Sequence, residues 1–229
     1  MNLRKYILVG ILLVASSVTM SVAANPREDI HDSADQVQPL LPGMKAPHFK
    51  VRDVKGQPFQ YQAEEQGKPV VLTFYRGGWC PYCNLHMSEM RLVEDQLTEM
   101  GFEIWFISID KPELLYESLD DPDTGYTIYS DSSLDATRSF GLAFRVDDAL
   151  NERYLGYGID LEKASGENHH VLPAPATYII GADGVINFAY INPDYTVRLH
   201  PDVLLAAAKA YHEDADKRLA KKRKQAKKK

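Results

Sequence analysis

The chain has 229 residues, 45% hydrophobic and 25% charged, with two cysteines; this composition suits one globular domain and excludes a collagen, a disulfide-dense small protein and a wholly disordered chain. The net charge of −6 conceals an acidic body, because residues 25–216 hold 15 basic against 32 acidic residues, whereas residues 217–229 hold nine basic residues and no acid. Such a body lacks the basic face that neutralises phosphates, so we expect no nucleic-acid partner.

Residues 1–24 have the pattern of a secretory signal peptide. Arg4 and Lys5 precede an uncharged apolar run (6–15), and small residues lead up to Ala24. This order predicts cleavage after Ala24 and export, to the periplasm or out of the cell. The alternative is an uncleaved membrane anchor, because no charge follows Lys5 in this segment.

Three further segments follow the predicted signal peptide. Residues 25–41 are polar and acidic without periodicity, which predicts a flexible linker. Pro42-Gly43 opens a domain that we expect to span residues 42–212. Residues 213–229 form a basic tail, either a solvated extension of the last helix or a contact for the anionic surface of a membrane or another polyanion.

Strand-length and helix-length apolar patterns alternate through the domain. The first strands form a hairpin around Lys55-Gly56, and the most apolar strand (68–75) has the continuous hydrophobicity of one buried on both faces. The predicted strands are 48–54, 57–62, 68–75, 102–109, 126–130, 176–180 and 185–191, and the predicted helices are 80–100, 112–119, 134–140 and 201–212. Residues 143–172 are expected to be an irregular insertion. This order predicts an α/β fold with a central mixed sheet flanked by helices.

The two cysteines form the motif Cys80-Pro81-Tyr82-Cys83, directly after a buried strand and at the start of a helix. The unpaired amides and positive dipole of a helix N-terminus favour a thiolate at Cys80. Cys83 is one helical turn away, where its sulfur can attack a bond formed on Cys80. The motif therefore predicts a redox-active dithiol, with both cysteines catalytic.

Two other roles for the cysteines stay open. A structural disulfide is disfavoured, because so short a loop removes only about 2 kcal/mol of unfolded-state entropy. A copper or zinc site is the second alternative, with His86, His169 or His170 completing a set that two cysteines cannot fill. We expect no resident metal.

The motif and its surroundings resemble a known family. The strings Phe74-Tyr75-Arg76-Gly77-Gly78-Trp79-Cys80-Pro81-Tyr82-Cys83 and Pro173-Ala174-Pro175-Ala176-Thr177-Tyr178 are similar to the peroxiredoxin-like branch of the thioredoxin-fold superfamily, the group of alkyl hydroperoxide reductases and thiol-specific antioxidants. The resemblance covers residues 42–210 and implies a thioredoxin-like fold. It implies no bound cofactor, a disulfide or peroxide substrate and an external thiol reductant.

Three further residues are candidate site residues, one of them through the resemblance. Pro175 occupies the position of the superfamily's cis-proline, which implies a cis Ala174–Pro175 bond and a substrate-positioning role. Trp79 and Arg76 are candidates to shield the dithiol and to favour its thiolate or bind an anionic group.

One departure from the family affects the expected reaction. Peroxiredoxins carry a proline and a Thr or Ser before the peroxide-attacking cysteine, and a distant arginine. In the Cys83 register those positions hold Arg76 and Cys80, and the arginine position holds Pro175. In the Cys80 register they hold Thr73 and Gly77, so neither register is complete. We therefore expect thiol-disulfide exchange, with peroxide reduction and a metal-delivering thioredoxin-fold chaperone as the alternatives.

Overall fold

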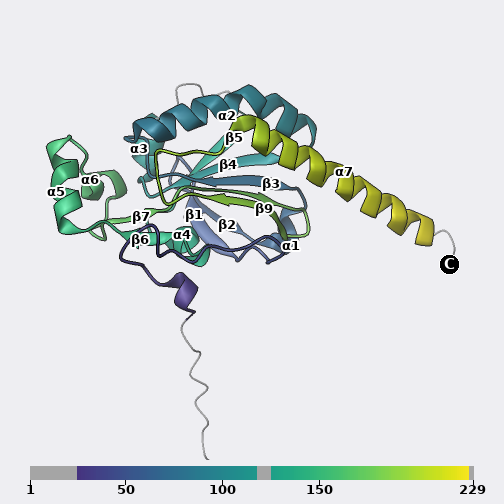
Figure 1. Ribbon diagram of the computed structural model, residues 1–229, viewed down its shortest axis with the longest axis horizontal. Coiled ribbons are helices and arrows are strands. Elements are labelled where there is room, and N and C mark those ends of the chain that lie inside the picture. Colours follow the sequence, from purple (N-terminus) through teal and green to yellow (C-terminus); the bar gives the residue numbers. More distant parts are fainter. Residues whose placement is uncertain (1–24, 118–124, 227–229) are drawn as a thin grey trace, which may run out of the picture.

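The computed structural model describes residues 25–117 and 125–226, so the predicted signal peptide lies outside the described residues. A seven-stranded sheet forms the centre of the molecule (Figure 1). Its strand order is β2 (Pro58–Tyr61), β1 (Phe49–Arg52), β5 (Tyr126–Ser130), β4 (Glu103–Ser108), β3 (Val70–Phe74), β8 (Ala176–Ile180) and β9 (Ile186–Ile191). The predicted hairpins are both present, as the β1–β2 and β8–β9 pairs.

The middle of the sheet confirms the predicted mixed architecture. Strand β3 runs parallel to β4 and antiparallel to β8, and all five of its residues are buried. Side chains of a strand alternate between the two faces of a sheet. Val71 accordingly joins the core beneath α2, whereas Val70 and Leu72 join the core on the opposite face.

Helices cover both faces of the sheet (Figure 1). One face packs against α2 (Pro81–Glu99) and α7 (Pro201–Ala226), which share Met90, Val93, Leu97, Leu204 and Ala208 with the strands in one core. The other face packs against α4 (Asp135–Ser139) and the short helix α1 (Ala63–Gln66). The short helix α3 (Pro112–Glu117) places Leu115 in the core on the α2 side. Among the described helices, none is long and apolar enough to cross a membrane.

Residues 25–41 are not the flexible linker that we expected. They include the 3-10 helix η1 (Pro26–Glu28) and lie along the domain, where Arg27 donates hydrogen bonds to the carbonyls of Gln38 and Pro39. Leu40 is buried, and its amide donates to the Phe140 carbonyl. An apolar residue inside a polar stretch therefore holds this segment on the fold.

The 143–172 segment is also more ordered than predicted. It forms a two-stranded sheet of β6 (Ala143–Arg145) and β7 (Val171–Pro173) and two helices, α5 (Asp148–Gly156) and α6 (Leu161–Ser165). Asp147 and Asp160 cap these helices by accepting main-chain hydrogen bonds. The helices project from one end of the sheet and place Tyr154 against Trp79 (Figure 1).

The last helix extends beyond its predicted end at His212. Helix α7 continues to Ala226, and its second half leaves the body of the molecule (Figure 1). The predicted basic tail is therefore mostly a helical continuation of α7. Among the α7 side chains that the structure describes, those packed in the core run from Leu204 to Tyr211, which matches the predicted helix end at His212.

Candidate active site

Both cysteines lie at the start of α2, where the chain leaves the central strand β3. Cys80 is the residue before the first helical turn, and Pro81 is the first helical residue. Proline suits that position because its missing N–H has no partner in a helix. The amides of Cys83 and Asn84 donate to the Cys80 carbonyl, which starts the helix. The two thiols are free and almost completely buried, with exposed fractions of 1% and 0%.

The surroundings of Cys80 favour its thiolate. Its pKa is lowered to about 6, chiefly because the Cys83 thiol donates a hydrogen bond to it. Burial opposes this effect, while the Arg76 guanidinium, the backbone amide of Cys83 and Arg198 reinforce it. A sulfur with this pKa is largely ionised at neutral pH, as a nucleophilic thiol requires.

Cys83 has the opposite character in the same state. The hydrogen bond that the Cys83 thiol donates to Cys80, its own burial and the negative charge on Cys80 raise the pKa of Cys83 far above its ordinary value. Arg198 acts against this increase. The reduced pair therefore holds one thiolate, on Cys80, and one thiol, on Cys83. In this charge state only Cys80 is ready to attack a substrate.

Arg76 is a buried cation beside Cys80. Its Nη1 lies 4.0 Å from the Cys80 sulfur, and only 3% of the residue is exposed. The guanidinium stacks on three rings, 4.0 Å from the Tyr195 centroid, 5.0 Å from Trp79 and 5.3 Å from Tyr154. It also donates a hydrogen bond to the Tyr154 hydroxyl. These contacts hold the charge in place where water is excluded.

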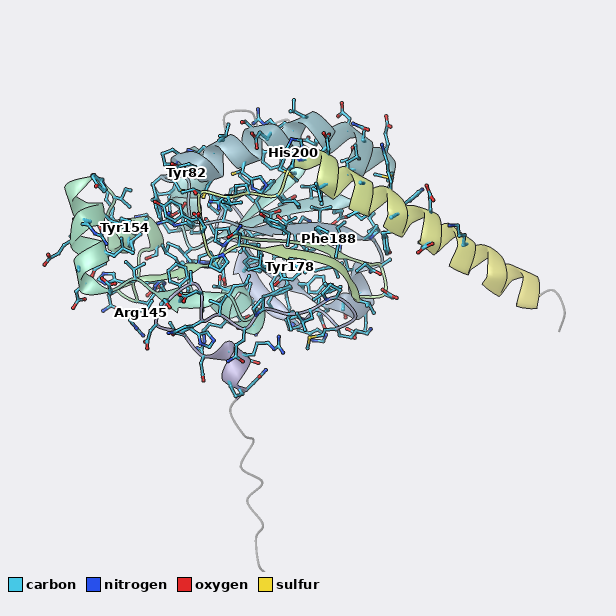
Figure 2. The ribbon with its side chains drawn as sticks, in the orientation of Figure 1. Tyr82, Arg145, Tyr154, Tyr178, Phe188 and His200 are labelled. Atoms are coloured by element: carbon cyan, nitrogen blue, oxygen red, sulfur yellow. The ribbon has the colours of Figure 1, made fainter. Side chains whose placement is uncertain are left out.

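The three rings come from separate parts of the chain. Figure 2 shows Tyr154 on α5, at the same end of the sheet as Tyr82 on the first turn of α2. Tyr195 belongs to the connection between β9 and α7, residues 192–200, which we call the 192–200 loop. Its ring also meets Tyr82 edge-on at 5.7 Å. Together the aromatic residues cover the dithiol and limit its contact with water.

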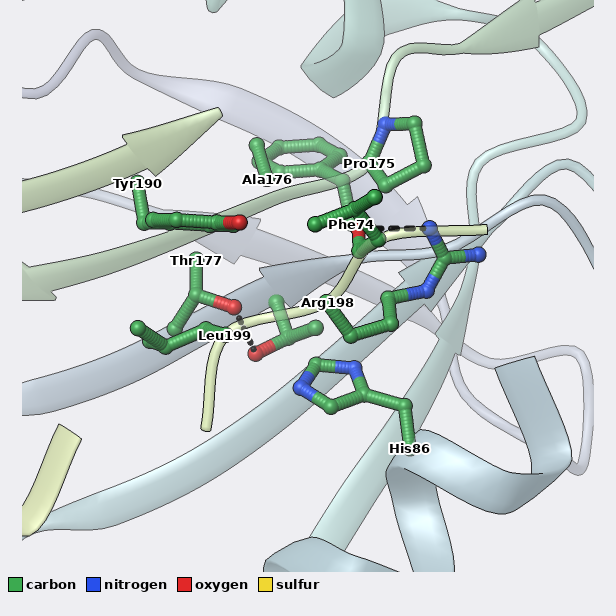
Figure 3. A pocket seen from close by; sticks show the side chains of 10 residues that line it. Phe74, His86, Pro175, Ala176, Thr177, Tyr190, Arg198 and Leu199 are labelled. Carbon is green, nitrogen blue, oxygen red and sulfur yellow. Dashed lines mark hydrogen bonds between the residues drawn. The ribbon is translucent and has the colours of Figure 1, made fainter. Parts of the chain in front are cut away.

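A second arginine contacts the other sulfur. Arg198, in the 192–200 loop, donates from Nη2 to the Cys83 sulfur at 3.3 Å. It lines a cavity of about 10 Å³ that also includes His86, Pro175, Thr177 and other residues of β3 and β9. Figure 3 shows the Arg198 side chain with Pro175 on one side and His86 on the other. A cavity of this size holds about one water molecule.

His86 faces this cavity as a neutral imidazole. Burial, together with the nearby positive charge of Arg198, lowers its pKa to about 4. Its Nε2 atom is buried and has no hydrogen-bond partner among the described residues. The helix position one turn after Cys83 therefore faces inward, although an exposed helix face is the common place for histidine.

Asp110 lies on the other side of the cysteine loop. Its carboxylate accepts a hydrogen bond from the Gly78 amide at 2.7 Å, and burial raises its pKa to about 6. A Cβ atom on Gly77 would lie 2.3 Å from the Trp79 indole nitrogen and 2.7 Å from Asp110. Glycine at position 77 therefore allows Trp79 and Asp110 to close around the start of α2.

The Ala174–Pro175 bond is trans, so the implied cis-proline is wrong for this chain. Ala174 and Pro175 form the short connection between β7, in the two-stranded sheet, and β8, in the seven-stranded sheet. The Ala174 amide donates to Leu142, and the Pro175 carbonyl accepts from Asn192. Pro175 lines the same cavity as Arg198, whose guanidinium contacts the Cys83 sulfur.

Two of the three histidines of the metal alternative, His169 and His170, are engaged away from the cysteines. His169 contacts the Ser132 carbonyl and the Val171 amide, and His170 pairs with Glu162. Within residues 25–117 and 125–226, no group of three or more His, Cys, Asp or Glu side chains could hold a metal ion. A chaperone site built from Cys80, Cys83 and one of these histidines is therefore not assembled here.

Comparisons with known proteins find relatives over most of the chain. A model of the AhpC/TSA family matches residues 42–189. Peroxiredoxin Bcp of Escherichia coli strain K12 is 26% identical over 169 residues, which cover 74% of this chain and 96% of that protein. The thiol-disulfide oxidoreductase ResA of Halalkalibacterium halodurans is 29% identical over 101 residues, 44% of this chain and 56% of ResA.

Solved structures share the fold at lower identity. Peroxidoxin BcpB from Mycobacterium tuberculosis superimposes with a TM-score of 0.56 at 19% identity, covering 74% of this chain and 96% of its own. Xanthomonas campestris peroxiredoxin Q gives a TM-score of 0.55 at 17% identity, with 77% and 98% covered. These likenesses confirm the predicted thioredoxin-like fold.

Proposed function

The chain belongs to the AhpC/TSA family of peroxiredoxin-like, thioredoxin-fold oxidoreductases. From this premise we propose that it is an exported thiol-disulfide oxidoreductase whose redox pair is Cys80 and Cys83. The observation that carries the proposal is the pair of unlike sulfurs at the start of α2. A thiolate at Cys80 and a thiol at Cys83 are the two groups that disulfide exchange uses in succession.

The first step is attack by Cys80. Its thiolate attacks one sulfur of a substrate disulfide, the substrate S–S bond breaks, and the second substrate sulfur leaves as a thiolate. Cys80 is then joined to the substrate as a mixed disulfide. Arg76 supports this step because its guanidinium stabilises the attacking anion.

The second step is resolution by Cys83. Its sulfur attacks the Cys80 sulfur of the mixed disulfide, the remaining substrate sulfur leaves, and a Cys80–Cys83 disulfide forms. The two cysteines lose two electrons and the substrate gains them. An external thiol reductant then returns the pair to its free form.

Burial of the dithiol favours small substrates. Trp79 and Tyr195 cover the site, and both cysteines are almost inaccessible. A disulfide on a folded protein would need the covering rings to move, whereas a small disulfide needs a narrower path. We therefore expect small-molecule disulfides to react faster than disulfides of folded proteins.

The test compares wild type with Cys80→Ser and Cys83→Ser on a small aromatic disulfide that releases a coloured thiolate. We expect Cys80→Ser to lose at least a hundredfold in turnover. Cys83→Ser should release one thiolate per chain and stop, with the substrate bound at Cys80 by mass spectrometry. Wild-type turnover by Cys80→Ser would overturn the proposal.

Peroxide reduction is the second candidate, favoured by the similarity to peroxiredoxin Bcp and by the small size of the cavity that Arg198 lines. In that reaction Cys80 would be oxidised to a sulfenic acid and then condense with Cys83. Stopped-flow oxidation by hydrogen peroxide, no faster than that of a free thiol of the same pKa, would dismiss this candidate.

Export rests on the signal-peptide pattern of residues 1–24. We expect the mature protein from the native host to begin at Asn25. A full-length mass including Met1 or Asn2 in a soluble extract would contradict this expectation.

A further inference from the structure

The second step poses a chemical problem for Cys83. Resolution needs a thiolate on Cys83, yet this sulfur is fully buried and is held as a thiol while Cys80 is charged. Without water around it, a buried thiolate needs a positive partner supplied by the protein. The described residues supply that partner from outside the cysteine motif.

Arg198 is placed to be the partner. Its Nη2 lies 3.3 Å from the Cys83 sulfur, whereas the Nη1 of Arg76 lies 4.0 Å from the Cys80 sulfur. Each sulfur of the pair therefore has its own guanidinium. A guanidinium remains charged at any working pH and donates directly to an anion.

The other groups that face Cys83 do not substitute for Arg198. His86 follows one turn later on α2 and is neutral, with a pKa of about 4. Tyr75, at the end of β3, is buried, and its pKa is raised well above its usual value, so it stays protonated. The backbone amide of Arg76 donates a hydrogen bond to Cys83, but its guanidinium contacts the Cys80 sulfur.

We propose that Arg198 is a catalytic residue of the resolving step: it stabilises the Cys83 thiolate that attacks the mixed disulfide on Cys80. The inference rests on the proposed function. Two arginines from distant parts of the chain then divide the reaction, with Arg76 serving attack and Arg198 serving resolution.

The arrangement also sets the order of the steps. Attack converts the Cys80 anion into a neutral mixed disulfide, which removes the charge that holds the proton on Cys83. The Cys83 proton passes to the first departing substrate thiolate, which leaves as a thiol, and Arg198 then faces the Cys83 thiolate. Cys83 then forms the S–S bond with Cys80 as the Cys80–substrate bond breaks. Cys83 is therefore activated only after Cys80 has reacted.

The test measures the two steps separately in Arg198→Ala and Arg198→Lys. Release of the first coloured thiolate reports attack, and release of the second reports resolution. For Arg198→Ala we expect less than a twofold change in attack, at least a tenfold slower resolution at pH 7, and a resolution pH midpoint at least one unit higher. Arg198→Lys should recover most of the rate, because a cation near the sulfur is restored.

A loop control separates chemistry from structure. Thr196 bonds to Asp194 within the 192–200 loop and does not contact either sulfur. Thr196→Ala should loosen the loop while keeping the Arg198 charge, and it should resolve at the wild-type rate. A loss equal to that of Arg198→Ala would assign the effect to loop order and overturn the inference.

The remaining outcomes are distinct. If wild type forms and resolves a mixed disulfide on Cys80, and Arg198→Ala resolves it at the same rate and pH midpoint, this inference alone fails. If wild type forms no mixed disulfide on Cys80, the proposed function fails and the inference fails with it.

Discussion

The two loops that bring arginines to the dithiol differ in how they are built. The connection from β3 to α2 places Arg76 four residues before Cys80, whereas the 192–200 loop places Arg198 against a cysteine 115 residues earlier in the chain. The first contact is local and follows from a short motif. The second exists only because β9 and α7 return the chain to the start of α2.

The loops also differ in how firmly they hold their arginine. Arg76 is 3% exposed and is stacked among three rings. Arg198 is partly exposed and lies in a loop whose Tyr195 and Val197 are 39% and 43% exposed. The tightly packed Arg76 suits the Cys80 thiolate, which is present throughout the reduced state. Arg198, on a more exposed loop, suits the Cys83 thiolate, which forms only during turnover. The predictions below separate the two sulfurs and the two loops.

The largest expected effect is on the pH dependence of stability of the reduced protein. The pKa of Cys80 is about 6 in the folded chain and about 8.5 for an unperturbed thiol, so folding favours the thiolate. This stabilisation is complete above pH 8.5 and is lost as pH falls through 6. The difference in unfolding free energy between wild type and Cys80→Ser should therefore grow by about 1.4 kcal/mol per pH unit between those values.

Urea unfolding under reducing conditions from pH 5 to pH 8.5 measures this difference. Cys83→Ser is the matched variant, because its hydroxyl can still donate to the Cys80 thiolate, and it should keep most of the wild-type slope. A difference between wild type and Cys80→Ser that stays constant with pH would show that Cys80 is not ionised in this range.

The next effect is on attack and concerns the first loop. Arg76→Met keeps most of the side-chain volume but removes the charge 4.0 Å from Cys80. The pKa of Cys80 should rise by about one unit, which reduces the thiolate fraction, and with it the alkylation rate at pH 6, about fivefold. Iodoacetamide alkylation against pH gives both values. Arg52→Met, which removes an arginine bonded to Ser132 instead, should leave the profile unchanged.

The smallest effect concerns the aromatic cover from the second loop. Tyr195→Ala removes the ring that lies 4.0 Å from the Arg76 guanidinium, a contact worth about 0.5–2 kcal/mol. Cys80 should then react several-fold faster with a bulky maleimide relative to iodoacetamide, because access is widened. Tyr157→Ala, at a 79% exposed tyrosine, is the control. Equal reagent ratios in the two variants would show that Tyr195 does not limit access.

Much of the central fold could be predicted from the sequence. The continuous apolar run through β3 and the alternating order of strands and helices were sufficient, because burial on both faces leaves a strong local pattern. Gly101 also marked the end of α2, where it adopts a positive φ of 86°. The prediction that residues 143–172 are irregular was wrong. The short helices in this segment are stabilised by Asp caps and by packing against Trp79, and they have no long apolar periodicity that the sequence could reveal.

The residues of the candidate site also fall into two groups, those that the sequence predicted and those that it did not. Cys80, Cys83 and Arg76 could be found because they lie within one strand-to-helix junction, whose helix N-terminus has a known effect on a thiol. Arg198, Tyr195 and Tyr154 were missed. Their neighbours in the sequence carry no motif, and no local period indicates that they approach a sulfur or a guanidinium.

The sequence by itself therefore determined that a dithiol begins a helix after a buried strand, since both the apolar pattern and the dipole effect act over a few residues. Only the tertiary structure decided which charges surround each sulfur. Electrostatic and cation–π contacts act through space between chain segments more than a hundred residues apart, and folding alone brings those segments together.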